Sequence, residues 1–276
     1  MDNAKITFDK NNYNKNILTP AECMRWAVDK MMIKTSSILQ ALMYSENLEP
    51  EQLIDIHRTY LYERKMMSTI HNISILYDGG KLNTHFASYD VRHFLRSVVK
   101  YTHKLFRDSR IEFYIDCEKR SAYAVFDVKL MSFIIFNLIS NSILHTKRRE
   151  KTVNINASVK QNNFIISYKD NGSGISAAKR RTLFIPNNSV ITREEIEESG
   201  GFMSVGLGLK ASYKAAVDMG GSIECLSGKG AEFIITIPQK KDDIGFNEVC
   251  EADIDTDFAL SLLAAPLLKE KFGEQG

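Results

Sequence analysis

The sequence predicts an α+β protein, in which an N-terminal antiparallel helical hairpin precedes a two-layer α/β sandwich. The first observation is the distribution of the fifteen glycines: none occurs in the first 78 residues, and ten fall between Gly172 and Gly230. A glycine-free stretch favours helices, whereas a glycine-rich one favours loops that turn sharply or approach a ligand. The second observation is the positions of the prolines, which mark boundaries at Pro20, Pro50, Pro186, Pro238 and Pro266.

The hairpin is predicted from two helical patterns that a short turn at 48–50 joins. In 21–47, apolar residues recur every three or four positions, with Thr35 at the missing step: Met24, Val28, Met31, Ile38 and Leu42. The second helix runs from Pro50 to about Tyr77 and carries Leu53, Ile56, Tyr60, Met67 and Ile70 before Gly79-Gly80. Each pattern makes one narrow apolar seam.

A hairpin with one seam has no core of its own. We therefore expect residues 21–80 to form a homodimer, in which two hairpins make a four-helix bundle. The alternative is that the hairpin packs against its own C-terminal domain. An arm of residues 1–20 precedes it.

The α/β sandwich is expected over residues 88–238, where short apolar strands alternate with helices. The predicted helices cover 90–106, 127–145, 176–183 and 208–219, and the strands cover 111–117, 121–126, 152–160, 163–169, 222–226 and 231–238. This order predicts a mixed sheet with helices on one face.

Residues 239–276 form an acidic tail, with nine acidic residues against four lysines. The rest of the chain is then mildly basic, which suits an anion such as a nucleotide but is too scattered for a nucleic-acid-binding protein. The apolar run 258–268 in the tail could be a short docking helix or could have no ordered structure.

The composition is that of a globular chain, with 44% apolar and 25% charged residues. No apolar stretch reaches the ~18–20 residues of a membrane span, and the charged start is unlike a signal peptide, so a cytoplasmic location is expected. The four cysteines, which have no CxxC pair or metal-ligand spacing, are expected to be reduced structural thiols: Cys23, Cys117, Cys225 and Cys250.

Four features with chemical potential follow one another along the sandwich. Asn137 and Asn141 lie one turn apart on an apolar helix, where carboxamides need partners such as Mg²⁺ with phosphate oxygens. The segment 170–175 reads DNGSGI after a strand, so Asp170 could accept a hydrogen bond from an exocyclic amine. A polar loop over 185–205 has a length that is typical of a functional lid or of disorder. The last feature, 206–209 (GLGL), opens a helix whose N-terminus attracts phosphate.

Together and in this order, these features resemble the ATP-binding domain of sensor histidine kinases, within the GHKL ATPase superfamily. The N box is 137–141, the G1 box 170–175, a plausible F box 183–184 and the G2 box 206–209. The closing segment GGSIECLSGKGAEFIITIP resembles the last hairpin of that family.

The resemblance implies a sandwich of the histidine-kinase ATPase type that binds ATP and Mg²⁺. Asn141 would coordinate the metal with Asn137 nearby, and Asp170 would hold the adenine amine. The other ATP-binding positions that it implies are His145, Gly172, Gly174, Phe184, Gly206, Leu207, Gly208 and Leu209.

Two positions depart from the family pattern. Leu144 stands where the family usually has a Lys or Arg that contacts phosphate, and Ala231 stands where it usually has a Thr that helps to fix adenine. Each change is expected to weaken ATP binding by about 1 kcal/mol, which is typical of one lost hydrogen bond.

The hairpin also lacks the phosphoacceptor histidine that the family carries on its first helix. The first histidine in the chain is His57, and both His57 and His71 lie on the second helix. We expect these two side chains to make exposed or interhelical contacts rather than to accept phosphate.

Three functions are compatible with this pattern. The first is an ATP-dependent kinase-like enzyme of the two-component type, which phosphorylates a partner in trans or hydrolyses ATP slowly. The second is a non-catalytic pseudokinase-type regulator, whose nucleotide-dependent dimer binds a response regulator, another kinase or a sigma-factor-like partner. The third, a purely structural helical dimer, leaves the glycine boxes unexplained.

Overall fold

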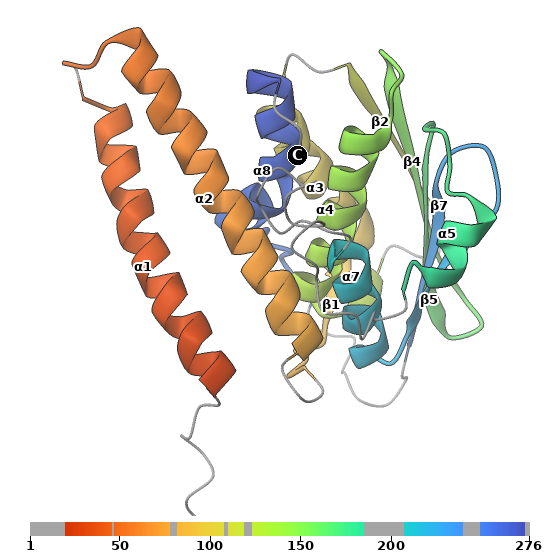
Figure 1. Cartoon of the computed structure of the whole chain (residues 1–276). Coiled ribbons are helices and arrows are strands. Elements are labelled where there is room, and N and C mark those ends of the chain that lie inside the picture. The colour runs from red at the N-terminus through yellow and green to blue at the C-terminus, as the bar shows by residue number, and fades with distance from the viewer. Residues whose placement is uncertain are drawn as a thin grey trace, which may run out of the picture.

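The computed structural model describes residues 20–45, 47–77, 82–107, 110–118, 123–184, 207–239 and 249–273. It confirms the α+β class, with a helical hairpin followed by a sandwich of helices on a mixed sheet. Figure 1 shows α4, α7 and α8 between the hairpin and the larger sheet.

The hairpin consists of α1 (Pro20–Met43) and α2 (Pro50–Tyr77), and both lie close to the predicted ranges. The face of α1 that meets α2 has a partly polar centre, because Ser36 donates a hydrogen bond to Glu63 (2.7 Å) and accepts one from Arg64 (2.7 Å). The opposite face of α2 packs against α7 and α8. Thus α2 packs against the C-terminal domain of its own chain, as the alternative considered for the hairpin has it, and α1 is the outermost helix (Figure 1).

The larger sheet has the strand order β2-β4-β5-β7-β6. Its strands are β2 (Ile111–Cys117), β4 (Lys151–Lys160), β5 (Asn163–Asp170), β6 (Ser222–Leu226) and β7 (Glu232–Pro238). β2 and β4 are parallel and the other pairs are antiparallel, so the sheet is mixed. β4 and β5 meet at Gln161 and Asn162, which have positive φ values of 49° and 62° and form the tight turn.

A smaller sheet has the order β3-β1-β8. It comprises β1 (Ala87–Asp90), β3 (Tyr123–Phe126) and β8 (Val249–Cys250). The sequence pattern predicted only β3, because β1 is four residues long and β8 two, and each gains its partners from segments far away along the chain.

Aspartates begin the two long helices that cover the sheets. Asp90 accepts from the backbone N–H of His93 (2.8 Å) at the start of α3 (Val91–Leu105), and Asp127 accepts from Lys129 and Leu130 at the start of α4 (Val128–His145). These are N-caps, which satisfy backbone donors that have no partner within the helix. The shorter helices are α5 (Ala177–Thr182) and α7 (Leu207–Asp218).

The apolar run in the acidic tail forms a helix, α8 (Thr256–Phe272), which settles a question that the sequence left open. Asp255 caps its start, and Gly273, with φ 68°, ends it in the left-handed conformation. α8 packs against both α2 and α4, and Leu262, Leu263 and Leu267 are buried there. The helix α8 is therefore part of the hydrophobic core.

Among the described residues, one helix is long and apolar enough to cross a membrane, namely α4. Its side chains Phe133, Ile134, Ile135 and Phe136 are buried, and 67% of the residues of this helix are buried inside the fold. Burial in the core accounts for the apolar character of this helix.

Candidate nucleotide-binding site

A pocket of about 740 Å³ lies where five helices and the loop after β5 meet. Eight of the predicted site residues line it: Asn137, Asn141, His145, Asp170, Gly172, Gly174, Gly208 and Leu209. These positions are separated by as many as 72 residues in the chain. The fold thus brings the N box, the G1 box and the described part of the G2 box to one cavity.

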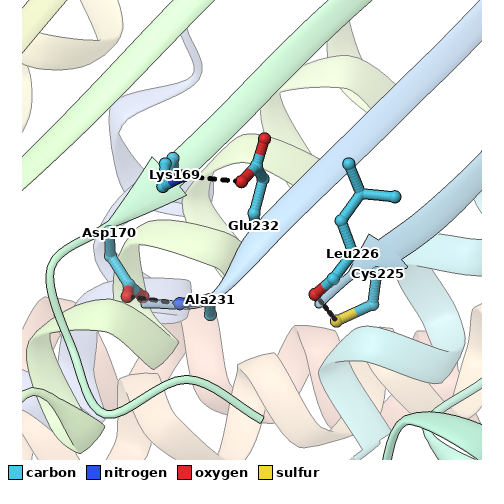
Figure 2. Close-up of polar contacts among 6 residues, drawn as sticks. All are labelled: Lys169, Asp170, Cys225, Leu226, Ala231 and Glu232. Carbon is cyan, nitrogen blue, oxygen red and sulfur yellow. Dashed lines mark hydrogen bonds and ion pairs between the residues drawn. The ribbon is translucent and has the colours of Figure 1, made fainter. Parts of the chain in front are cut away.

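Asp170 is buried at the end of β5 with its carboxylate in a fixed position. Its Oδ1 accepts from the backbone N–H groups of Gly172 (2.9 Å) and Ala231 (2.8 Å), and its Oδ2 accepts from the Ser142 hydroxyl (2.7 Å). Figure 2 shows the carboxylate reaching from β5 to Ala231 at the start of β7. A carboxylate has about four acceptor sites, so one remains for an exocyclic amine.

Tyr168 supports the carboxylate of Asp170 through the hydroxyl of Ser142. Its hydroxyl donates to Ser142 Oγ (2.9 Å), and the Ser142 hydroxyl in turn donates to Asp170. Complete burial raises the pKa of Tyr168 far above its usual value, so that the phenol keeps its proton and remains a donor. The three side chains form one directed chain of hydrogen bonds.

Two glycines allow the close backbone approaches that the pocket needs. A Cβ at Gly208 would lie 2.7 Å from Asn137 Oδ1, so any larger residue at the start of α7 would displace the amide of Asn137. A Cβ at Gly230 would lie 1.9 Å from the carbonyl oxygen of Asp170, and this glycine also has φ +84°. Gly230 therefore allows the last hairpin to approach Asp170, a role that the sequence did not assign to it.

The two asparagines of α4 present amide groups to the cavity. Asn137 is buried, and its Nδ2 donates to Ser212 Oγ of α7 (3.3 Å), which leaves the amide oxygen toward the start of α7. Asn141 is half-buried and forms no side-chain hydrogen bond with any described residue. An orphaned amide oxygen is a suitable ligand for Mg²⁺, which prefers oxygen and retains several waters.

This arrangement fits a metal that arrives with its own ligands. Within the described ranges, no group of three or more His, Cys, Asp or Glu side chains could hold a metal ion alone. Mg²⁺ at Asn141 and Asn137 would therefore need phosphate oxygens and water to complete its coordination, as it does when it binds with a nucleotide.

His145 lies at the rim of the pocket at the end of α4. Burial lowers its pKa, and the nearby charges of Lys269 and Lys179 lower it further, while Asp170 acts in the opposite direction. The imidazole is therefore neutral at pH 7, which suits contact with an uncharged base better than with a phosphate.

Two predicted positions in the described part of the chain do not line the pocket, and a third lies outside that part. Phe184 stacks on Tyr213 of α7, with ring centroids 5.2 Å apart, and Leu207 is buried at the first position of α7. Gly206 and the predicted lid over 185–205 lie outside the described residues.

The structure shows which contacts Ala231 and Leu144 make at the two positions that depart from the family pattern. The backbone N–H of Ala231 donates to Asp170, so this residue positions the carboxylate without a hydroxyl. Leu144 lines the pocket without a charge, and its carbonyl oxygen accepts a hydrogen bond from Lys269 Nζ of α8 (2.8 Å). A cation is favourable there because the C-terminus of a helix carries partial negative charge.

The two histidines of α2 make interhelical contacts with α8. His57 meets Phe272 edge-on (6.1 Å between centroids), and His71 meets Phe258 in the same way (4.9 Å). Burial, followed by the charge of Lys271, lowers the pKa of His57. Both rings therefore have a packing role at the α2–α8 interface.

One wall of the pocket was not predicted, because it comes from α2 and α8. Lys65, Ser68, Thr69 and Asn72 contribute from α2, and Ser261, Leu262 and Ala265 from α8. Local sequence patterns hold no signal for these residues, since only long-range packing of three helices brings them to the cavity.

Comparison with known proteins agrees with this geometry. Residues 126–241 match the family model described as histidine kinase-, DNA gyrase B-, and HSP90-like ATPase, which confirms the resemblance seen in the sequence. No curated protein matches the chain.

Solved structures share the fold at low sequence identity. The histidine kinase AdeS of Acinetobacter baumannii is 18% identical, with a TM-score of 0.54 over 77% of this chain and 97% of AdeS. Full-length ShkA in complex with AMPPNP is 18% identical, with a TM-score of 0.62 over 80% of this chain and 46% of ShkA. The histidine kinase ThkA, in complex with the response regulator protein TrrA, is 17% identical, with a TM-score of 0.51 over 79% of this chain and 61% of that chain.

Proposed function

Because residues 126–241 form a domain of the histidine kinase-, DNA gyrase B- and HSP90-like ATPase family, we propose that the chain is an ATP-binding signalling protein of the two-component type. The observation that carries the proposal is the fixed carboxylate of Asp170 in a cavity of about 740 Å³. Nucleotide-sized ligands occupy cavities of ~300–1,000 Å³ that are mostly apolar with a few placed polar groups.

In this proposal, Asp170 Oδ2 accepts a hydrogen bond from the adenine amine, while Gly172 and Gly174 leave room for the flat base. The phosphates extend toward Gly208 at the start of α7, where free backbone N–H groups and the helix dipole favour anions. Asn141 and Asn137 hold Mg²⁺, which neutralises phosphate charge when it is bound. The similar fold of ShkA, solved with AMPPNP, supports a nucleotide as the ligand.

The dimer is also part of the proposal, and the seam on α1 supports it. Met31, Ile38 and Leu42 are 60%, 62% and 40% exposed, although they form one stripe with Thr35 at helical spacing. An exposed apolar stripe on the outermost helix is typical of an interface. We propose that a second copy of the hairpin covers this stripe and completes a four-helix bundle.

A response regulator or another kinase is the proposed partner. The structural neighbour ThkA was solved with the response regulator protein TrrA. The match to that kinase covers 79% of this chain. Since the proposed ligand is ATP, we place the protein in the cytoplasm.

A regulator without phosphoryl transfer is the second candidate, and one observation favours it. No histidine occurs before His57, so α1 offers no acceptor, and both histidines of α2 pack against α8. In this second candidate, ATP binding changes the affinity of the dimer for its partner and no phosphate moves.

Incubation of the purified chain with Mg²⁺ and γ-labelled ATP separates the two candidates. A label that survives alkali but not acid would indicate phosphohistidine and support the kinase. The absence of label, together with nucleotide binding measured by calorimetry on the same sample, would support the regulator. The absence of both label and binding would contradict the proposed function as a whole.

A further inference from the structure

A buried lysine from the hairpin forms part of the cavity wall. Lys65 of α2 is 3% exposed and lines the cavity together with Asn137, Asn141 and Gly208. Burial lowers the pKa of Lys65, because a low-dielectric environment disfavours the ammonium ion. An ammonium ion in a buried position is stabilised by hydrogen bonds and by anions around it.

Contacts between three helices show where along the cavity Lys65 lies. His71 of α2 and Phe133 of α4 both meet Phe258 of α8, with ring centroids 4.9 Å and 6.0 Å apart. At the other end of α8, His57 of α2 meets Phe272, and the α4 carbonyl of Leu144 accepts from Lys269. Therefore α8 runs antiparallel to α2 and parallel to α4.

His71, Phe133 and Phe258 therefore mark one common level along the three helices. The position of each pocket residue relative to that level follows from the helical rise of about 1.5 Å per residue. Lys65 precedes His71 by about 9 Å of helix, Asn141 follows Phe133 by about 12 Å, and Ala265 follows Phe258 by about 10 Å. The three residues thus lie within about one turn of the same level. Lys65 and the proposed magnesium ligand Asn141 therefore line the same cavity at a similar level, and α8 packs against the helices of both.

The small residues leave space for the end of the lysine side chain. Ser261 and Ala265 are the α8 residues that line the cavity near this level, together with Leu262. Asn72, two turns beyond Lys65 on the same face of α2, also lines the cavity, and its buried Oδ1 has no hydrogen-bond partner among the described residues. This acceptor is available to a donor group of a ligand or to a water molecule.

The other lysines of the cavity lie on a different side. Lys147 follows Thr146, which lies against Gly172, and Lys179 is on α5 directly after the G1 loop. Both side chains are exposed. Leu144, on the N-box helix itself, brings no charge to the cavity.

We infer that Lys65 is a phosphate-binding residue of the ATP site, supplied by the hairpin to the catalytic domain. This inference rests on the proposed function, since it requires ATP with its phosphates near Asn141 and the start of α7. An ammonium ion makes charge-assisted hydrogen bonds to phosphate oxygens, which are stronger than neutral ones. Nucleotide binding would then join the hairpin helix α2 to the ATPase domain.

Calorimetric titration of Mg-ATP and of adenosine into Lys65→Met tests the inference. We expect ATP to bind about 10- to 100-fold more weakly, the range of one charge-assisted hydrogen bond, while adenosine binding stays within about twofold. Lys65→Gln keeps a polar end, and we expect it to show the same selective loss. Lys100→Met on α3, which removes an exposed lysine outside the cavity, serves as the matched control.

The ratio of ATP to adenosine affinity decides the outcome. If both substituted chains keep the wild-type ratio, Lys65 does not contact the phosphates, and the proposed function stands without it. If the wild-type chain binds neither ligand, the proposed function fails and the inference fails with it. An equal loss of ATP and adenosine affinity would indicate a structural role for Lys65 and would also overturn the inference.

Discussion

The chain of hydrogen bonds from Tyr168 through Ser142 to Asp170 shows how single residues make the site. Each group has one function in the series: a buried phenol donates, a hydroxyl relays, and a carboxylate accepts. The motif DNGSGI predicted Asp170, but Ser142 and Tyr168 belong to no motif. Their contribution depends on β5 lying beside α4, which is a property of the packed fold.

Ser142→Ala should destabilise the fold through this chain. The substitution leaves the completely buried hydroxyl of Tyr168 without an acceptor, and we expect the free energy of unfolding to fall by about 1–3 kcal/mol. Adding Tyr168→Phe removes the second polar group and should recover part of that loss. Urea unfolding of the two single variants and the double variant measures this coupling; strictly additive losses would contradict it.

At the residue scale, the motifs predicted which positions the fold brings together. The boxes place Asn137, Asn141, Asp170, Gly172, Gly174 and Gly208 around one cavity. Phe184 stacks on Tyr213 instead of lining the cavity, because the residue that turns inward there is its neighbour Leu183. No local pattern indicated that Lys65 lines the cavity, because a lysine in a helix is usually exposed and only the packing of the whole fold buries this one.

At the element scale, periodicity and capping residues predicted the long helices and the strands of the larger sheet closely. Asp90, Asp127 and Ser176 are caps that mark helix starts in the sequence itself. The short strands β1 and β8 were not predicted, because they are stabilised by pairing with strands that are distant in the sequence and show no local pattern. The packing of α8 against α2 and α4 was not predicted either, because this helix is apolar around most of its surface and shows no periodic face.

The helix α1 provides the prediction at this scale. Ile38→Asp places a charge in the middle of the exposed stripe of α1, where burial in a bundle would desolvate it. We expect the chain to change from a dimer to a monomer in light scattering, while calorimetry shows unchanged ATP affinity. Leu226→Asp, at an exposed position on the edge strand β6, is the control and should remain dimeric. A dimeric Ile38→Asp chain would contradict the proposed interface.

At the scale of the whole molecule, three segments that are distant in sequence share one core. The C-terminal helix α8 packs against both the hairpin helix α2 and the N-box helix α4, and all three helices line the cavity. The sequence predicted the hairpin and the sandwich as separate units. It could not predict that α8 joins them, because that arrangement depends on contacts such as His71–Phe258–Phe133, which are formed only in three dimensions.

The central claim is that this cavity binds ATP with Asp170 at the adenine end. The most direct test is calorimetric titration of Mg-ATP into the wild-type chain and into Asp170→Asn, which keeps the shape of the side chain but places an amide where the amine would donate. We predict measurable binding by the wild type and its loss, by about 10-fold or more, in the variant, because a charged acceptor has been removed. Equal ATP affinity in the two chains would contradict the assignment of the site.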